Sequence, residues 1–150
     1  MAWMILDRFT TPQKRLDAWR EFREIHASSS PETIVESFNL VKYDSNNFDY
    51  YTHKSWPDCW DILTNKMFCY SGVNLLLFDT LTALDKVCYN NATWHIVDNH
   101  ITGQAGLVFM IDNQCFNITP GKIDNYNNIK EDFLIFNTIG KNSDIQRIVK

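Results

Sequence analysis

Cys69 is the residue of this sequence whose type and position are best suited to covalent chemistry. It lies four residues before Val73, where an apolar stripe with helical spacing begins, so its thiol shares the buried helix face if the helix starts early enough. The partial positive charge at a helix N-terminus lowers the pKa of a thiol, and the thiolate is the nucleophile. The alternative is a cysteine that only packs as a small hydrophobic residue. Ser71 is the better N-cap, which would leave Cys69 just outside the helix.

The cysteines and histidines show no metal-binding pattern. No two cysteines are separated by two residues, and no histidine has a partner four residues away; the cysteines are Cys59, Cys69, Cys88 and Cys115, and the histidines are His26, His53, His95 and His100. Four cysteines spaced this widely do not make a disulfide scaffold, so we expect reduced thiols. We expect no metal and no cofactor.

Composition and charge indicate one domain, residues 1–150, that is helical over 1–88 and β-rich over 89–150. The chain is 45% hydrophobic, and its net charge of -4 is spread evenly, so neither half is suited to a polyanion and we expect no nucleic-acid partner. The aromatic residues of 48–60 form either an interface or a core, and Lys54 is the only basic residue among them.

The first 15 residues lack the pattern of a signal peptide, and no apolar run approaches the roughly 20 residues that span a bilayer. We therefore expect a protein that is neither secreted nor bound to a membrane and that resides in a host cytoplasm or in a virion. Asparagine is abundant and is often paired, which is typical of AT-rich coding sequences such as those of many bacteriophages; the pairs are Asn46-Asn47, Asn90-Asn91 and Asn127-Asn128.

Three helices and a central fourth are predicted in the first half. Thr11-Pro12 and Ser30-Pro31 are N-cap and N1 pairs that start helices over about 12–27 and 31–41. A capping box at 55–58 predicts a short helix that carries Trp60, Ile62 and Leu63. The strongest periodic signal runs from Val73 to Leu84 and predicts a buried central helix.

After residue 91 the sequence turns to β-branched and aromatic residues, which indicates strands. We expect strands over 93–97, 107–111, 115–118 and 133–136, with a tight hairpin turn at Asp112-Asn113. The fold class is therefore α+β: N-terminal helices, with a central cysteine-bearing helix packed on a C-terminal antiparallel sheet.

Residues 56–120 resemble the transglutaminase-like branch of the papain-like fold. The resemblance rests on Phe68-Cys69-Tyr70-Ser71-Gly72 running into an amphipathic helix, followed by a strand over 88–97 and a hairpin. In that family a cysteine opens the core helix, a histidine lies on the hairpin, and an acid on the partner strand orients the imidazole. The resemblance implies thiol acyl transfer or amide hydrolysis by a thiolate–imidazolium pair.

The resemblance can be aligned in two registers. In the first, Gln104 takes the place of the histidine and Thr119 that of the acid, so only Cys69 is present and the site is degenerate. An amide cannot act as a general base near neutral pH. In the second, His95 or His100 is the base and Asp112 orients it, although a structural role explains His95 equally well. His53, in the loop before the capping box, is a further candidate base.

Two functions follow, and the first is the one we expect. The first is a non-catalytic structural or interaction protein with protein partners, a bacteriophage virion component on a degenerate transglutaminase-like fold. The second is an active cysteine hydrolase or acyltransferase that acts on amide bonds, with Cys69 as nucleophile. An unrelated α+β binding module remains a third interpretation, because fold analogy alone does not establish function.

Overall fold

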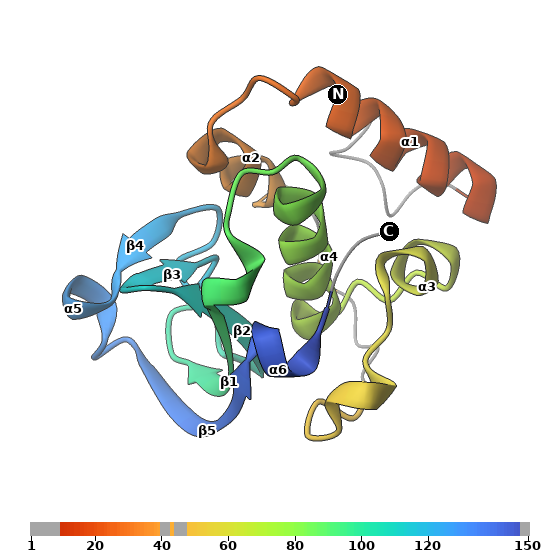
Figure 1. The fold of residues 1–150 in the computed structure, drawn as a ribbon. Helices are drawn as coiled ribbons and strands as arrows, with labels where there is room; N and C mark the ends of the chain where they lie inside the picture. Colours follow the sequence, from red (N-terminus) through yellow and green to blue (C-terminus); the bar gives the residue numbers. More distant parts are fainter. Residues whose placement is uncertain (1–9, 40–42, 44–47, 148–150) are drawn as a thin grey trace.

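A curved antiparallel sheet forms the C-terminal part of the protein (Figure 1). The description comes from a computed structural model and covers residues 10–39, 43 and 48–147. The strands, in chain order, are β1 (Ala92–Asn99), β2 (Gln104–Ile111), β3 (Gln114–Phe116), β4 (Ile123–Asn125) and β5 (Phe133–Lys141). Their spatial order is β4-β3-β2-β1-β5, and all neighbours are antiparallel.

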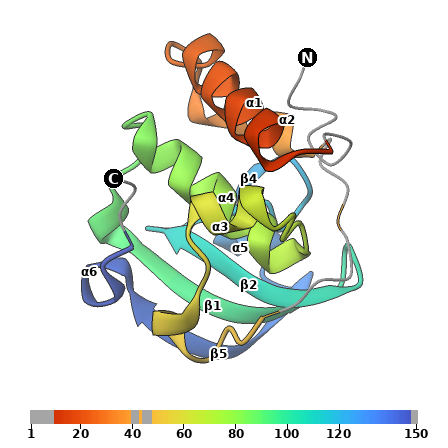
Figure 2. The same ribbon diagram turned by 90° about the vertical axis from the view of Figure 1, so that its right-hand side faces the viewer.

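The helices precede the sheet, apart from two short ones near the C-terminus. They are α1 (Pro12–Ile25), α2 (Pro31–Phe38), α3 (Cys59–Thr64), α4 (Tyr70–Ala83), α5 (Tyr126–Ile129) and α6 (Asn142–Ile145), with the 3-10 helices η2 (His53–Ser55) and η3 (Tyr89–Asn91). Figure 2 shows α4 lying across the sheet, with α1, α2 and α3 on the outer side of α4. This arrangement confirms the α+β class and a central helix packed on a C-terminal antiparallel sheet.

Of the first three predicted helix starts, two are confirmed and one is wrong. The Thr11 side chain accepts a hydrogen bond from the Lys14 N–H, and Ser30 caps α2 in the same way. The capping box does not start α3, because the hydroxyl of Ser55 donates to the Thr52 carbonyl and closes η2. Asp58 is the N-cap of α3 instead, and its carboxylate accepts from the Asp61 N–H.

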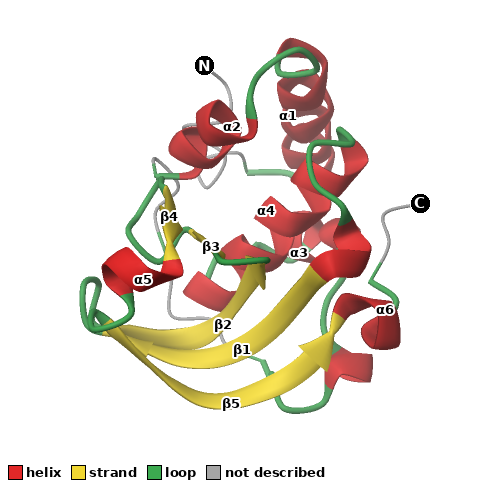
Figure 3. Ribbon diagram, turned by 60° about the vertical axis from the view of Figure 1, so that its left-hand side comes forward, coloured by secondary structure: helices red, strands yellow, loops and turns green. Residues whose placement is uncertain are grey.

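The predicted strands are present, but the sequence did not reveal how the last one pairs. The turn at Asp112-Asn113 joins β2 to β3 as expected, with Ile111 opposite Gln114. β5 crosses to the far side of the sheet and pairs with β1, where it forms the outer edge in Figure 3. β4, three residues long, had not been predicted.

The core lies between α4 and the sheet. Nearly the whole of α4 is buried, and Phe78 contacts both Trp94 of β1 and Phe109 of β2 with ring centroids 4.9 and 5.0 Å apart. Trp19 joins α1 to this core, because its indole N–H donates to the Thr80 hydroxyl at 2.9 Å. The core therefore packs α4 between the sheet and α1.

Candidate functional site

Cys69 is the N-cap of α4. Its Sγ accepts a hydrogen bond from the Gly72 N–H at 3.4 Å, and the residue is 7% exposed. The prediction that Ser71 would cap this helix is wrong, since Ser71 lies inside the first turn. Cys69 therefore lies closer to the positive end of the helix dipole than the sequence suggested.

The first turn of α4 packs directly against the backbone of β2. The Ser71 hydroxyl accepts from the Leu107 N–H, and the Asn74 amide donates to the Leu107 carbonyl, both at 2.9 Å. A Cβ added to Gly106 would collide with the Ser71 Oγ. Position 106 of β2 therefore has no room for a catalytic side chain.

Gln104 begins β2, and Thr119 follows β3. Gln104 is the exposed first residue of β2, opposite Asn99 at the end of β1. Thr119 lies beyond β3, in a bend where its carbonyl accepts from the Lys122 N–H. Neither side chain supplies a general base or an ionised acid at the helix end.

His95 is held by two threonine hydroxyls. Its Nε2 lies 2.8 Å from the Thr93 Oγ1, and its Nδ1 lies 2.9 Å from the Thr138 Oγ1 of β5. Trp94 and Ile96 belong to the core under α4, so strand alternation directs His95 to the opposite face. Burial lowers the pKa of His95, because it disfavours the charged form of the ring. These contacts describe a structural histidine.

The other residues of the second register lie apart. His100 follows β1 and is exposed, with its Nε2 3.6 Å from an Asp98 carboxylate oxygen. Asp112 lies in the turn at the opposite end of the hairpin. His95 is opposite Val108, four residues before Asp112, which is about 14 Å along a strand. The structure therefore does not bring His95, His100 and Asp112 together with Cys69.

A buried polar network that the sequence did not reveal lies beside the first turn of α4. The Asn117 amide donates to the Asn74 Oδ1 at 2.9 Å and to the Tyr43 hydroxyl at 3.1 Å. The Tyr70 hydroxyl donates to the Asn117 carbonyl and accepts from the Asn99 amide, both at 3.1 Å. The network therefore joins α4 to the last residue of β1 and to the segment after β3 with uncharged groups.

A cleft of about 520 Å³ opens at the other end of α4, between α3, η2 and the C-terminal residues. It gathers residues that are far apart in the sequence, namely His53, Lys54, Trp56, Asp58, Cys59, Trp60, Asp79, Asp144, Ile145, Gln146 and Arg147. Burial raises the pKa of the Cys59 thiol to about 12, so this thiol is not activated. His53 lines this cleft together with Cys59, rather than standing over Cys69.

Three further features of the described residues concern membrane-spanning helices, metal sites and disulfides. None of the helices in the described ranges is long and apolar enough to span a bilayer. No cluster of three or more histidine, cysteine, aspartate or glutamate side chains in the same ranges could hold a metal ion. No disulfide joins the four cysteines, of which Cys88 is exposed.

No family model, curated protein or solved structure matches this chain.

Proposed function

We propose that this protein is a non-catalytic structural or interaction protein built on a degenerate transglutaminase-like core. The observation that carries the proposal is the direct packing of the Cys69-bearing turn on β2. Ser71 and Asn74 bond the backbone of β2 there, and Gly106 leaves no room for another side chain.

The chemistry of thiol acyl transfer supports the same conclusion. A cysteine nucleophile needs a base that takes its proton and later returns it to the leaving group. Both ring nitrogens of His95 are engaged by threonine hydroxyls, and the buried groups next to the helix end are amides and phenols. The network satisfies its own hydrogen bonds, which favours a role in fixing the fold.

The proposal extends to the setting of the protein. The abundance of asparagine favours a bacteriophage source, and we infer a component of a phage particle whose partners are proteins. Nucleic acid is a poor partner for this chain, because the net charge is -4 and no basic patch is present in its sequence.

One observation favours the alternative, an active cysteine hydrolase or acyltransferase. Cys69 caps a 14-residue helix and accepts a backbone N–H, which is a position that stabilises a thiolate. That role would require a base brought to Cys69 by a rearrangement of the chain or by a partner.

A turnover assay separates the two functions. The wild-type protein, Cys69→Ala and Cys88→Ala are incubated with chromogenic thioester and amide substrates, and product is followed over many turnovers. Cys88 is the matched control because it is an exposed thiol that follows the C-terminal end of α4, whereas Cys69 caps the N-terminal end. We expect the same background rate for all three proteins. Turnover by the wild type and Cys88→Ala that is lost in Cys69→Ala would overturn the proposal.

A further inference from the structure

The two edges of the sheet differ greatly in length. β4 ends one side with three residues, whereas β5 ends the other with nine and pairs only with β1 among the described strands. Alternate residues of an edge strand direct unpaired N–H and C=O groups outward. β5 is therefore the one long edge in the described part of the protein that can accept another strand.

The edge strand β5 is apolar and partly exposed. The eight residues from Phe133 to Gly140 carry no charge, and Leu134 and Phe136 are 52% and 57% exposed. Exposed large apolar side chains on an edge strand are typical of a surface that another chain covers. Phe136 has no opposite residue on β1, because the register shifts between Ile96 and Val97 and leaves it as the extra residue of a bulge.

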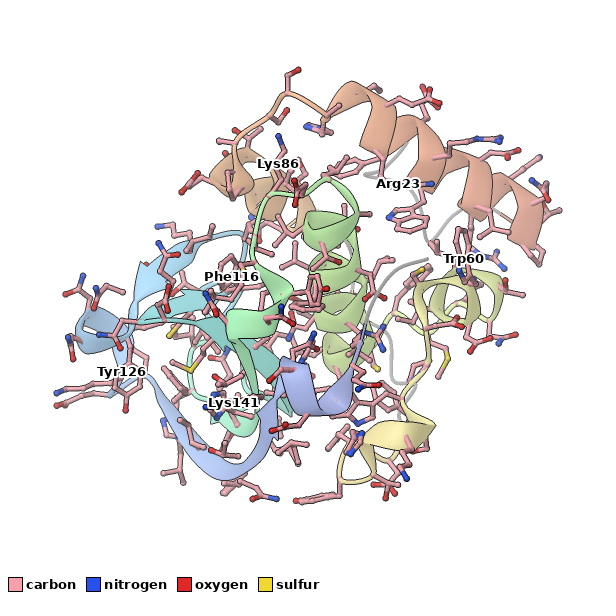
Figure 4. All side chains as sticks on the ribbon, in the orientation of Figure 1. Arg23, Trp60, Lys86, Phe116, Tyr126 and Lys141 are labelled. Carbon is pink, nitrogen blue, oxygen red and sulfur yellow. The ribbon has the colours of Figure 1, made fainter. Side chains whose placement is uncertain are left out.

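Charge differs between the two ends of β5. The segment 130–132 before the strand carries a net charge of -1, and Lys141 ends the strand. Neither Asp132 nor Lys141 forms an ion pair within the described residues. Figure 4 shows the two ends well separated, with Tyr126 of α5 near the start of the strand and Lys141 at its end.

We propose that β5 pairs antiparallel with β5 of a second copy of this chain, which joins the two sheets across a two-fold axis. The inference deepens the proposed function, because it names the partner of the interaction surface. An antiparallel arrangement brings the acidic start of each strand to the Lys141 end of the other, whereas a parallel one would place like charges together.

The charges at the strand ends support this direction. With the two-fold axis near the middle of β5, residues 130–132 of each copy lie beside the Lys141 end of the other, and Phe136 of both copies lies in the interface.

The same geometry explains why the partner is a second copy. A two-fold pairing uses the long edge of both molecules and leaves only the three-residue β4 at either end, so the assembly closes as a dimer.

Analytical ultracentrifugation over about 1 μM to about 1 mM tests the pairing. We expect a monomer–dimer equilibrium for the wild type and a monomer throughout for Phe136→Lys. Ile25→Lys is the matched control, because Ile25 is 56% exposed but lies on α1, and this variant should dimerise like the wild type. Circular dichroism establishes that each variant is folded.

A charge exchange tests the antiparallel direction of the pairing. Asp132→Lys and Lys141→Asp should each weaken dimerisation about tenfold, because each brings like charges together at the ends of the paired strands, and the double variant should restore it. A wild type that stays monomeric, a dimer that survives Phe136→Lys, or a double variant no better than the single ones would overturn the inference. None of these results would bear on the proposal that Cys69 is not catalytic, because the turnover assay tests that proposal separately.

Discussion

Arg147 reaches back from the C-terminal end of the described chain to Asp79 in α4, with its Nε 2.9 Å from Oδ1 and its Nη2 against Oδ2. The side chains of Asp79 and Arg147 are 3% and 9% exposed. Both residues line the cleft near the C-terminal end of α4, and the pair joins Arg147, which follows α6, to the core helix.

Breaking the ion pair between Asp79 and Arg147 should destabilise the folded protein. Arg147→Met leaves the Asp79 carboxylate buried without a partner, so we expect the free energy of unfolding at pH 8 to fall by about 3 kcal/mol in urea titrations. The double variant Asp79→Leu with Arg147→Met should recover most of this loss, because two apolar groups need no compensation. A single variant as stable as the wild type would show that the pair does not form.

Asp79 should also give stability a specific dependence on pH. Burial raises the pKa of Asp79 to about 6 from 3.8, although Arg147 acts to lower it. The folded state therefore binds more protons than the unfolded state between these values, and stability from this group falls as pH rises from about 4 to about 6. Urea titrations across this range should show the decline in the wild type and its loss in Asp79→Asn.

His95 should make stability depend on pH in the opposite sense to Asp79. Burial lowers its pKa below 6.5, so the unfolded state binds the proton first and stability from this group falls as pH drops below about 6.5. We expect His95→Gln to lose less stability than the wild type between pH 7.5 and 5.5. His100→Gln is the control, because the His100 side chain is 56% exposed, and it should follow the wild type. Equal behaviour of both variants would contradict this account of His95.

The contact between α4 and β2 can be probed at Gly106. Gly106→Ala adds a methyl group against the Ser71 Oγ, and overpacking of this kind should lower the free energy of unfolding by about 1 to 3 kcal/mol. Ser71→Ala removes the oxygen, so the two substitutions should be less than additive in a double-mutant cycle. Additive effects would mean that the two residues do not touch.

The core helix and the strand positions were predictable because they depend on local patterns. The stripe from Val73 to Leu84 marked α4, and the turn at Asp112-Asn113 marked the hairpin between β2 and β3. β4 was too short to carry a period. The pairing of β5 with β1 is a choice among sheet edges that no local pattern specifies.

The candidate site was less predictable, because its geometry depends on contacts between distant segments. Ser71 has the residue type of an N-cap, but the Leu107 N–H uses its hydroxyl, and Cys69 caps the helix instead. The cleft joins residues from 53 to 147 and had no sequence signal. The abundance of asparagine was the only sequence feature related to the buried network of asparagine and tyrosine side chains. By itself it is interpreted only as a sign of an AT-rich coding sequence.

The most direct test of the non-catalytic account is the pH dependence of iodoacetamide reaction at Cys69. The measurement uses Cys88→Ser protein with and without His95→Gln, and peptide mass spectrometry separates Cys69 from Cys59 and Cys115. Burial raises the pKa of those two thiols to about 12 and about 11, so they react slowly. We predict that His95→Gln leaves the Cys69 profile unchanged. A reactive plateau well below the free thiol pKa of about 8.5 that disappears with His95→Gln would reveal a thiolate–imidazolium pair and contradict the account.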